Sequence, residues 1–251
     1  MYVEVEPRHS APFVEAFWLF ENRSGSPAAH PVVPDARSDL VVHLAGPERA
    51  EFIGCMTRTE IVRAAGGTVM AGVRFRPGAV HALSGLPMHE ITDLSADPRD
   101  LLGRRWLELH ATLRRESEKE PGRVIPILDR WLARVLAGQG GPTPVSLAAR
   151  AIQDSNGLAP LKNLASELGL SVRHLQRLFL LQVGLSPKLF ARVTRFQAVH
   201  RFLSGHGLAC LAQAALDAGY YDQAHFNRDY KEFAGVPPTH EQMSHLYKTN
   251  P

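Results

Sequence analysis

Residues 165–179 read ASELGLSVRHLQRLF, and residues 215–230 read ALDAGYYDQAHFNRDY. Both stretches follow one pattern, in which a small residue stands four positions before a glycine and a short amphipathic segment comes next. Each copy closes on a Gly/Pro turn, GLSP at 184–187 and GVPP at 235–238. The repetition predicts a tandem pair of helix-turn-helix units within the last 90 or so residues.

The first copy explains how this pattern produces two helices joined by a sharp turn. Ala165 is small enough to let two helices cross closely, and Gly169 can adopt the positive φ that ends a helix. Ser171 is a favourable N-cap for the helix that follows. The apolar residues of that helix, which we expect to be buried on one face, are Leu175, Leu178 and Phe179. The residues turned outward are then Arg173, Gln176, Arg177 and Leu180.

The second copy repeats these features with different residues. Asp222 takes the N-capping place of Ser171. The expected buried residues are Phe226, Tyr230 and Phe233, and the outward ones are Gln223, Asn227, Arg228 and Lys231. Arg, Gln and Asn carry donor arrangements that fit guanine and adenine edges in the major groove. A polar outer face is, however, also what any amphipathic helix presents to solvent.

Residues from about 143 to 247 resemble the DNA-binding domain of the AraC/XylS family of bacterial transcription regulators. The segments that carry the resemblance are SVRHLQRLF at 171–179, GLSP at 184–187, AGYYDQAHF at 218–226 and GVPP at 235–238. The family arrangement implies a long helix between the two units. Here it would begin near Pro187 and run to Gly205, with apolar side chains at Phe190, Val193, Phe196, Val199 and Phe202.

The resemblance also implies which side chains contact DNA. For the first unit they are Arg173, Gln176 and Arg177, and for the second unit Gln223, Asn227 and Arg228. We expect Asp229 to add negative charge near the second set. Contacts to the phosphate backbone are expected from Ser186, Lys188 and the helix N-termini. The two units would then enter successive major-groove segments about one helical turn apart.

The first 137 residues show a different pattern. Short apolar segments bounded by Pro, Gly and Ser predict strands at 13–21, 39–45, 51–57 and 68–76. Apolar spacing of i, i+3, i+4 predicts helices at 100–118 and 121–136. The segments PDARSDL at 34–40 and GVRFRPG at 72–78 look like those of a subgroup of AraC-type regulators.

The expected fold class is α+β, with an N-terminal small β-sheet or barrel domain carrying helices and a C-terminal all-α double helix-turn-helix domain. A Gly/Pro cluster places the boundary. We predict an effector-sensing or dimerisation domain at 1–137, a linker at 138–144 and the DNA-binding domain at 145–251.

An effector pocket in the first half would use aromatic and basic side chains. The candidates are Trp18, Phe20, Arg74 and Arg76, with Phe13 and Phe17 beside them. Arg74 and Arg76 stand two apart on a predicted strand and would share a face that receives an anion. Core packing of the aromatic residues and salt bridges of the arginines to nearby carboxylates are nevertheless the preferred interpretations.

Other kinds of chemistry find little support. His30, Asp35, Asp39 and His43 form no HxH or HExxH pair, so turn or surface roles are preferred over a metal site. The two cysteines, Cys55 and Cys210, form no CxxC, and buried reduced thiols are the preferred interpretation. We expect no catalytic residues, no metal and no cofactor.

The distribution of charge and the hydropathy of the sequence are consistent with a DNA-binding regulator. Residues 143–251 hold 11 Lys and Arg against 7 Asp and Glu, whereas residues 1–142 hold 17 against 18. No apolar run approaches the length of a membrane span and the N-terminus lacks signal-peptide features, so we expect a cytoplasmic protein with no membrane partner.

The partners considered are double-stranded DNA, RNA polymerase, a small-molecule effector and a second copy of the chain. Two alternatives stay open: a DNA-binding adaptor with an enzymatic or thiol-reactive N-terminal domain, and a ligand-independent architectural DNA binder.

Overall fold

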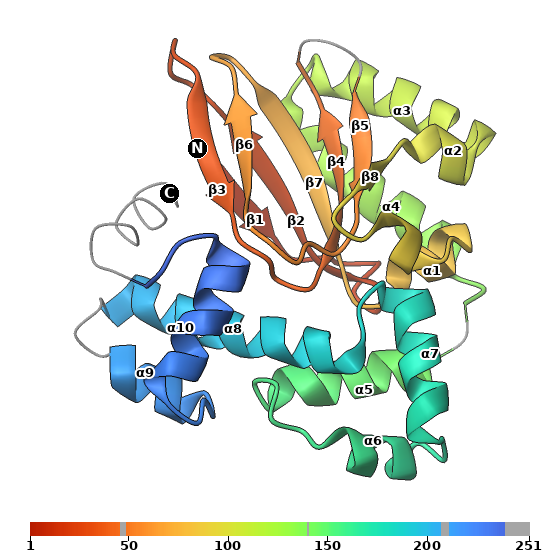
Figure 1. Ribbon diagram of the computed structural model, residues 1–251. Coiled ribbons are helices and arrows are strands. Elements are labelled where there is room, and N and C mark those ends of the chain that lie inside the picture. Colours follow the sequence, from red (N-terminus) through yellow and green to blue (C-terminus); the bar gives the residue numbers. More distant parts are fainter. Residues whose placement is uncertain (46–48, 140, 207–210, 239–251) are drawn as a thin grey trace.

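The computed structural model describes residues 1–45, 49–139, 141–206 and 211–238, without the side chains of 204–206. An antiparallel sheet with two long helices behind it forms the N-terminal half, and a layer of helices lies beneath it (Figure 1). Antiparallel strands in the first half, and helices without strands among the described residues of the second half, confirm the expected α+β class.

The N-terminal half contains two sheets. The larger has six antiparallel strands in the order β1-β2-β7-β4-β5-β8, and the smaller pairs β3 with β6. The strands are β1 (Tyr2–Val5), β2 (Val14–Glu21), β3 (Ala28–Val32), β4 (Ser38–His43), β5 (Ala50–Ile53), β6 (Glu60–Ala64), β7 (Val69–Phe75) and β8 (Ser95–Ala96). The four predicted strands correspond to β2, β4, β5 and β7. The segment predicted as a strand to Thr57 leaves the sheet after Ile53, where a loop begins.

Ten helices and two short 3-10 turns complete the part of the chain that the structure describes. In the first half they are α1 (Ala79–Ser84), η1 (Met88–Ile91), α2 (Pro98–Leu102), α3 (Arg104–Ser117), η2 (Pro121–Arg123) and α4 (Val124–Leu136). In the second half they are α5 (Pro144–Asp154), α6 (Leu161–Glu167), α7 (Val172–Val183), α8 (Pro187–His206), α9 (Leu211–Asp217) and α10 (Gln223–Ala234). The helix predicted from residue 100 is divided because Gly103, at φ +55°, ends α2 before α3 begins.

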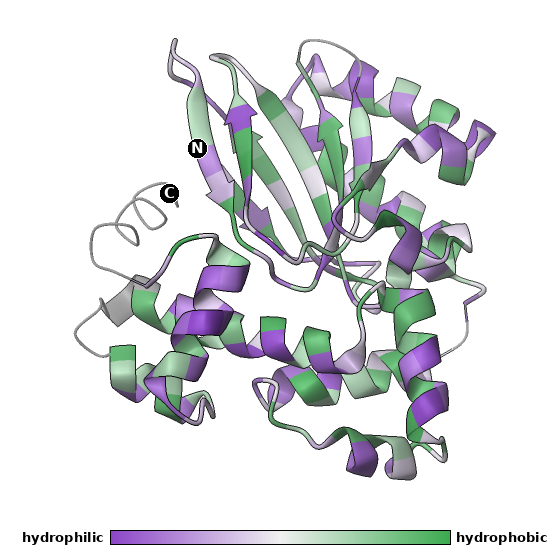
Figure 2. Cartoon of the chain, viewed as in Figure 1, coloured by the Kyte–Doolittle hydropathy of each residue, from purple (hydrophilic) through white to green (hydrophobic). Residues whose placement is uncertain are grey.

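Alternation along the strands decides how the large sheet packs. Phe17, Leu40 and Val73 point to one face and are fully buried. This face belongs to one core cluster with apolar residues of α3 and α4, including Leu113 and Leu132. The stripes of apolar residues are visible along these elements in Figure 2.

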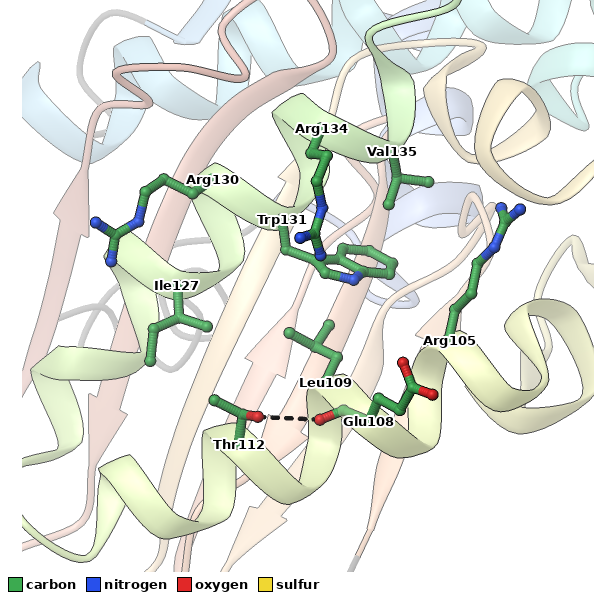
Figure 3. A pocket seen from close by; sticks show the side chains of 9 residues that line it. All are labelled: Arg105, Glu108, Leu109, Thr112, Ile127, Arg130, Trp131, Arg134 and Val135. Carbon is green, nitrogen blue, oxygen red and sulfur yellow. Dashed lines mark hydrogen bonds between the residues drawn. The ribbon is translucent and has the colours of Figure 1, made fainter.

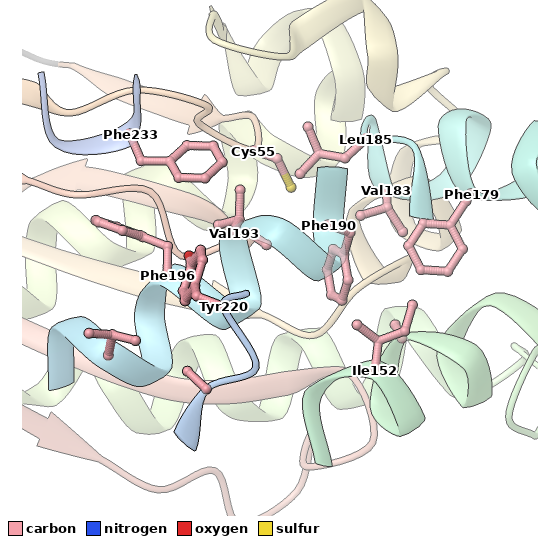
Figure 4. Packing of buried hydrophobic residues seen from close by; sticks show 14 of the residues in the cluster. Cys55, Ile152, Phe179, Val183, Leu185, Phe190, Val193, Phe196, Tyr220 and Phe233 are labelled. Atoms are coloured by element: carbon pink, nitrogen blue, oxygen red, sulfur yellow. The ribbon is translucent and has the colours of Figure 1, made fainter. Parts of the chain in front are cut away.

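A second core lies in the C-terminal half, around α8. Phe190, Val193 and Phe196 on α8 pack with residues of α5, α7 and α10 (Figure 4). This confirms the predicted connecting helix and its buried apolar positions, apart from Phe202, which is partly exposed. The same cluster includes Ala36 and Cys55 from the N-terminal half, so the two halves are in apolar contact.

Candidate nucleic-acid interface

The first helix-turn-helix unit consists of α6 and α7. Ala165 is fully buried, and Gly169 adopts φ +66° between the two helices. Ser171 caps α7, since its side chain accepts a hydrogen bond from the backbone N of His174 at 3.1 Å. The local signals in the sequence therefore produced the turn that they predict.

The outer face of α7 carries the predicted DNA-contacting residues. Arg173, Gln176 and Arg177 are exposed, while Leu175 and Phe179 are fully buried. No described carboxylate forms an ion pair with either arginine of this face. Their guanidinium groups are therefore available for an anionic partner or a base edge.

The second unit, α9 and α10, has the same construction. Gly219 adopts φ +78°, and the Asp222 side chain accepts a hydrogen bond from the backbone N of His225 at 2.7 Å. Phe226, Tyr230 and Phe233 are fully buried. The exposed residues of α10 include the predicted set, namely Gln223, Asn227, Arg228 and Lys231.

Asp229 is not part of this exposed face, contrary to the expectation from sequence. It stands three residues after Phe226, so it turns inward and is buried. There it pairs with Arg192 of α8, whose guanidinium also binds Glu232. The hydrogen bonds that Arg192 donates to Glu232 and Asp229 raise the pKa of its guanidinium, although partial burial opposes this. The face of α10 therefore carries no net acidic contribution from Asp229.

The second helix of a helix-turn-helix unit is termed its recognition helix. The two recognition helices, α7 and α10, run in a similar sense in the molecule. Figure 1 shows α7 and α10 extending from the lower edge of the C-terminal layer toward the N-terminal half. Arg173 and Gln223 lie in the first turns of their helices, at the ends away from the sheet. Helix N-termini and donor side chains are therefore exposed on one side of the molecule.

The residues predicted to contact phosphates, Ser186 and Lys188, lie at the opposite end of α7 from Arg173. Ser186 and Lys188 are exposed, but they follow the C-terminal end of α7 and so stand apart from Arg173. The hydroxyl of Ser186 accepts a hydrogen bond from the backbone N of Leu189 at 3.2 Å, which makes Ser186 a cap for α8. Lys188 lies at the start of that helix and forms no ion pair with any carboxylate that the structure describes.

The aromatic residues proposed for an effector pocket make contacts within the sheet. The indole of Trp18 lies so close over Gly72 that a Cβ there would come within 1.9 Å of it. Its Nε1 donates to a carboxylate oxygen of Asp39 at 3.0 Å, and its ring stacks on Tyr2. Phe20 is half-buried on the same strand.

The two arginines of β7 and its end are engaged with different partners. Arg74 donates to Glu4 at 2.8 Å and lies 3.6 Å from a carboxylate oxygen of Asp35. Arg76 stands just beyond the strand, is exposed, and donates to the backbone oxygen of Ala11 at 2.9 Å. The structure thus gives Arg74 the salt bridges that the sequence analysis preferred, and it does not join the two arginines in one anion site.

A groove lies between α3 and α4, and its lining residues were not among the candidate residues from the sequence. It has a volume of about 630 Å³ and a floor that includes Leu109, Ile127 and Trp131 (Figure 3). Three arginines border it, namely Arg105, Arg130 and Arg134. The amphipathic spacing of both helices was the signal that could have indicated it, but the pairing of the two helices was needed to bring the arginines together.

The cysteines and the His and Asp residues considered for a metal site show no feature of a reactive or metal-binding centre in the described part of the chain. Burial raises the pKa of the Cys55 thiol to about 12, and Cys210 lies outside the described residues. Within the described ranges, His, Cys, Asp and Glu form no group of three that could hold a metal ion. None of the described helices is long and apolar enough to cross a membrane.

Comparisons with known proteins agree with this arrangement. The family model of a helix-turn-helix domain matches residues 164–243, and that of a domain of unknown function, DUF6597, matches residues 4–97. No curated protein matches the chain.

Similar solved structures include that of ToxT from Vibrio cholerae O395, with 9% identity and a TM-score of 0.45 over 90% of this chain and 97% of that one. Another is ToxT bound to (E)-4-(8-methylnaphthalen-1-yl)but-3-enoic acid, with 8% identity and a TM-score of 0.45 over 91% and 99% of the two chains. The domain match, together with the two capped units, confirms the resemblance drawn from the sequence. The C-terminal half therefore contains a helix-turn-helix domain, and the β-rich region that the DUF6597 model matches precedes it.

Proposed function

We propose that α7 and α10 read DNA sequence by entering two successive major-groove segments of one duplex. The observation that carries this proposal is the repeated exposure of Arg, Gln and Asn side chains on two helices of the same construction. Such side chains form paired hydrogen bonds with guanine and adenine edges, which gives them a sequence-reading capacity that a merely basic surface lacks.

The test starts from the purified full chain and a library of random duplexes. We expect selection of one sequence in two parts, with centres separated by about 10 base pairs. Arg173→Ala should weaken protection of one part in a footprint, and Arg228→Ala should weaken protection of the other. Arg115→Ala, an exposed arginine of α3, serves as the charge-matched control. Binding without sequence preference would support an architectural role instead.

The N-terminal half supplies the regulatory input in this proposal. The groove between α3 and α4 is the better candidate for an effector than the Trp18 region, because Trp18 and Arg74 already bind neighbouring side chains. Its volume falls within the range of small-molecule sites, and its three arginines, against the one carboxylate of Glu108, favour an anionic compound. A second copy of the chain could also cover it.

Stabilisation of the full chain by a panel of anionic metabolites tests this part. Wild type and an Arg130→Ala/Arg134→Ala variant are compared by thermal shift. A compound that stabilises only the wild type supports the groove. Equal stabilisation of both proteins would place the effector elsewhere, and concentration-dependent sedimentation lost in the variant would favour self-association.

A thiol-reactive N-terminal domain is disfavoured. Cys55 is buried, and its raised pKa leaves almost no thiolate at neutral pH. Labelling of the native chain with a thiol probe, followed by mapping of the modified residue, checks this directly.

A further inference from the structure

Two loop segments of the N-terminal half, residues 54–59 and 91–94, lie against each other. The backbone N of Gly54 donates to the oxygen of Leu94 at 3.0 Å, and the backbone N of Asp93 donates to the oxygen of Cys55 at 3.1 Å. The Asp93 carboxylate then accepts from both the backbone N and the hydroxyl of Thr57, each at 2.6 Å. We call these two joined segments the bracket.

The bracket is held in a restricted conformation. A Cβ on Gly54 would come within 1.8 Å of the backbone oxygen of Ile91, so the two segments approach as closely as glycine allows. Asp93 adopts φ +56°, a conformation that few residues other than glycine accept, and Asp is one of those that do. Close approach and charge-assisted hydrogen bonds make the two segments one unit.

One end of the bracket contacts the end of α7. The hydroxyl of Thr92 donates to the backbone oxygen of Gly184, the C-cap of α7, at 2.9 Å. Gly184 itself fits tightly, since a Cβ there would meet the Met88 oxygen and the Thr92 hydroxyl at 2.8 Å. The C-terminal end of the first recognition helix is therefore docked on the N-terminal half.

The other end of the bracket contacts the end of α10. The backbone N and the hydroxyl of Thr59 both donate to the backbone oxygen of Phe233, at 2.8 and 2.9 Å. Phe233 is the penultimate residue of α10 and is fully buried. Each recognition helix thus meets a bracket threonine at its C-terminal end, which leaves its N-terminal end free.

The two recognition helices are also connected through α8. Arg192 and Phe196 of α8 contact α10, and α8 follows α7 after the Gly184–Pro187 turn. Through α8 alone, α7 and α10 could change their relative orientation by rotation at the Gly184–Pro187 turn. Because the bracket contacts both α7 and α10, a movement of one helix requires a movement of the other or the loss of a bracket contact.

We propose that the bracket fixes the position of α10 relative to α7, and thereby the spacing of the two DNA segments that the protein accepts. Thr59, Thr92 and Asp93 are positioning residues in this proposal, which rests on the proposed reading of DNA by both helices. β5 leads directly into one bracket segment and η1 into the other. A conformational change in the N-terminal half would therefore alter the distance between the two DNA segments that the protein accepts.

The experiment measures how the affinity of the full chain for DNA depends on the spacing between the two parts of its site. The selected two-part site is compared with derivatives that have one base pair inserted or removed between the parts, which shifts one part by about 3.4 Å and rotates it by about 35°. We expect wild type to lose about tenfold in affinity for each change. Thr59→Val/Thr92→Val lacks both hydroxyls and keeps only the backbone N of residue 59 as a donor to Phe233. In this variant the loss should fall to about threefold or less, while affinity for the original site decreases.

Matched variants separate positioning from general stability. Thr59→Ser/Thr92→Ser keeps both hydroxyls and should restore the steep spacing profile, and Thr68→Val should behave as wild type. Asp93→Asn keeps the left-handed backbone conformation but weakens the link to Thr57, and it provides the same test if the valine variant folds poorly. An unchanged profile in both the valine and the asparagine variants, with or without uniform loss of affinity, would overturn the proposal. Absence of any two-part site for wild type would instead reject the proposed reading of DNA by two helices.

Discussion

Asp229 of α10 is buried against Arg192 of α8, with 2.7 Å between the carboxylate oxygen and the guanidinium nitrogen. The pair joins α10 to the connecting helix α8 on the side away from the exposed residues of α10. Arg192 also lies over the ring of Phe233, 5.1 Å from its centroid. The charge that seemed from sequence to oppose DNA binding instead holds the helix in place.

Breaking this pair should destabilise the protein. Arg192→Met leaves the buried Asp229 carboxylate without its cation, and we expect a loss of about 2 kcal/mol in the free energy of unfolding, below the full cost of a buried pair because Arg192 is partly exposed. Urea denaturation measures it. Arg192→Met with Asp229→Asn should lose less than the sum of the single changes, and Arg150→Met, which breaks an exposed pair with Asp154, should lose under about 0.5 kcal/mol. Equal losses for the two arginine variants would contradict the role of burial.

Arg177→Ala should weaken binding to the selected DNA by about 1 to 3 kcal/mol and relax the preference at one base pair, provided that its guanidinium binds a guanine edge. Competition binding against single-base variants of the site measures both effects. A uniform loss across all sequences would identify Arg177 as a phosphate contact.

Gly72→Ala should disturb the sheet. The new methyl group would overlap the Trp18 indole, which must move away from its hydrogen bond with Asp39, and we expect a loss of about 1 to 3 kcal/mol in stability. Thermal melts with tryptophan fluorescence report both the stability and the altered environment of the indole. Gly138→Ala, which meets no atom within 4 Å, is the control. A variant as stable as this control would show that Trp18 moves without penalty.

Asp39 should make stability depend on pH. Burial, with a contribution from Asp35, raises the pKa of the Asp39 carboxyl from 3.8 to about 7. The folded chain therefore binds this proton more tightly than the unfolded chain, so stability falls as pH rises from about 4 to 7. Asp39→Asn removes the titration, and its melting temperature relative to wild type should increase from pH 4 to pH 8. Asp154→Asn, an exposed carboxylate, is the control, and parallel profiles for wild type and Asp39→Asn would refute the assignment.

The predicted boundary at 138–144 can be tested with fragments. We expect residues 142–251 to fold and bind DNA, and residues 1–137 to fold without binding it. The first fragment should melt at a lower temperature than the full chain, because it lacks the contacts of Ala36 and Cys55 with its core. Circular dichroism and DNA binding provide the measurements. An unstructured C-terminal fragment would mean that the two halves fold only together.

The sequence by itself determined the two helix-turn-helix units. Ser171 and Asp222 cap the helices from within three residues, and Gly169 and Gly219 form the turns with positive φ. The spacing of Phe226, Tyr230 and Phe233 decides which face is buried. All these signals act over one or two helical turns, so a single stretch of sequence contains them, and with them the exposed positions of the candidate DNA interface.

Only the tertiary structure decided how the halves meet. The contacts of Thr59 with Phe233 and of Thr92 with Gly184 join residues 174 and 92 positions apart. The short edge strand β1 and the partly polar pair β3 and β6 carry too weak an alternation to be predicted, and the groove between α3 and α4 depends on how two separate helices pack. Such features arise from the simultaneous burial of distant surfaces, and no local pattern specifies which surfaces will meet.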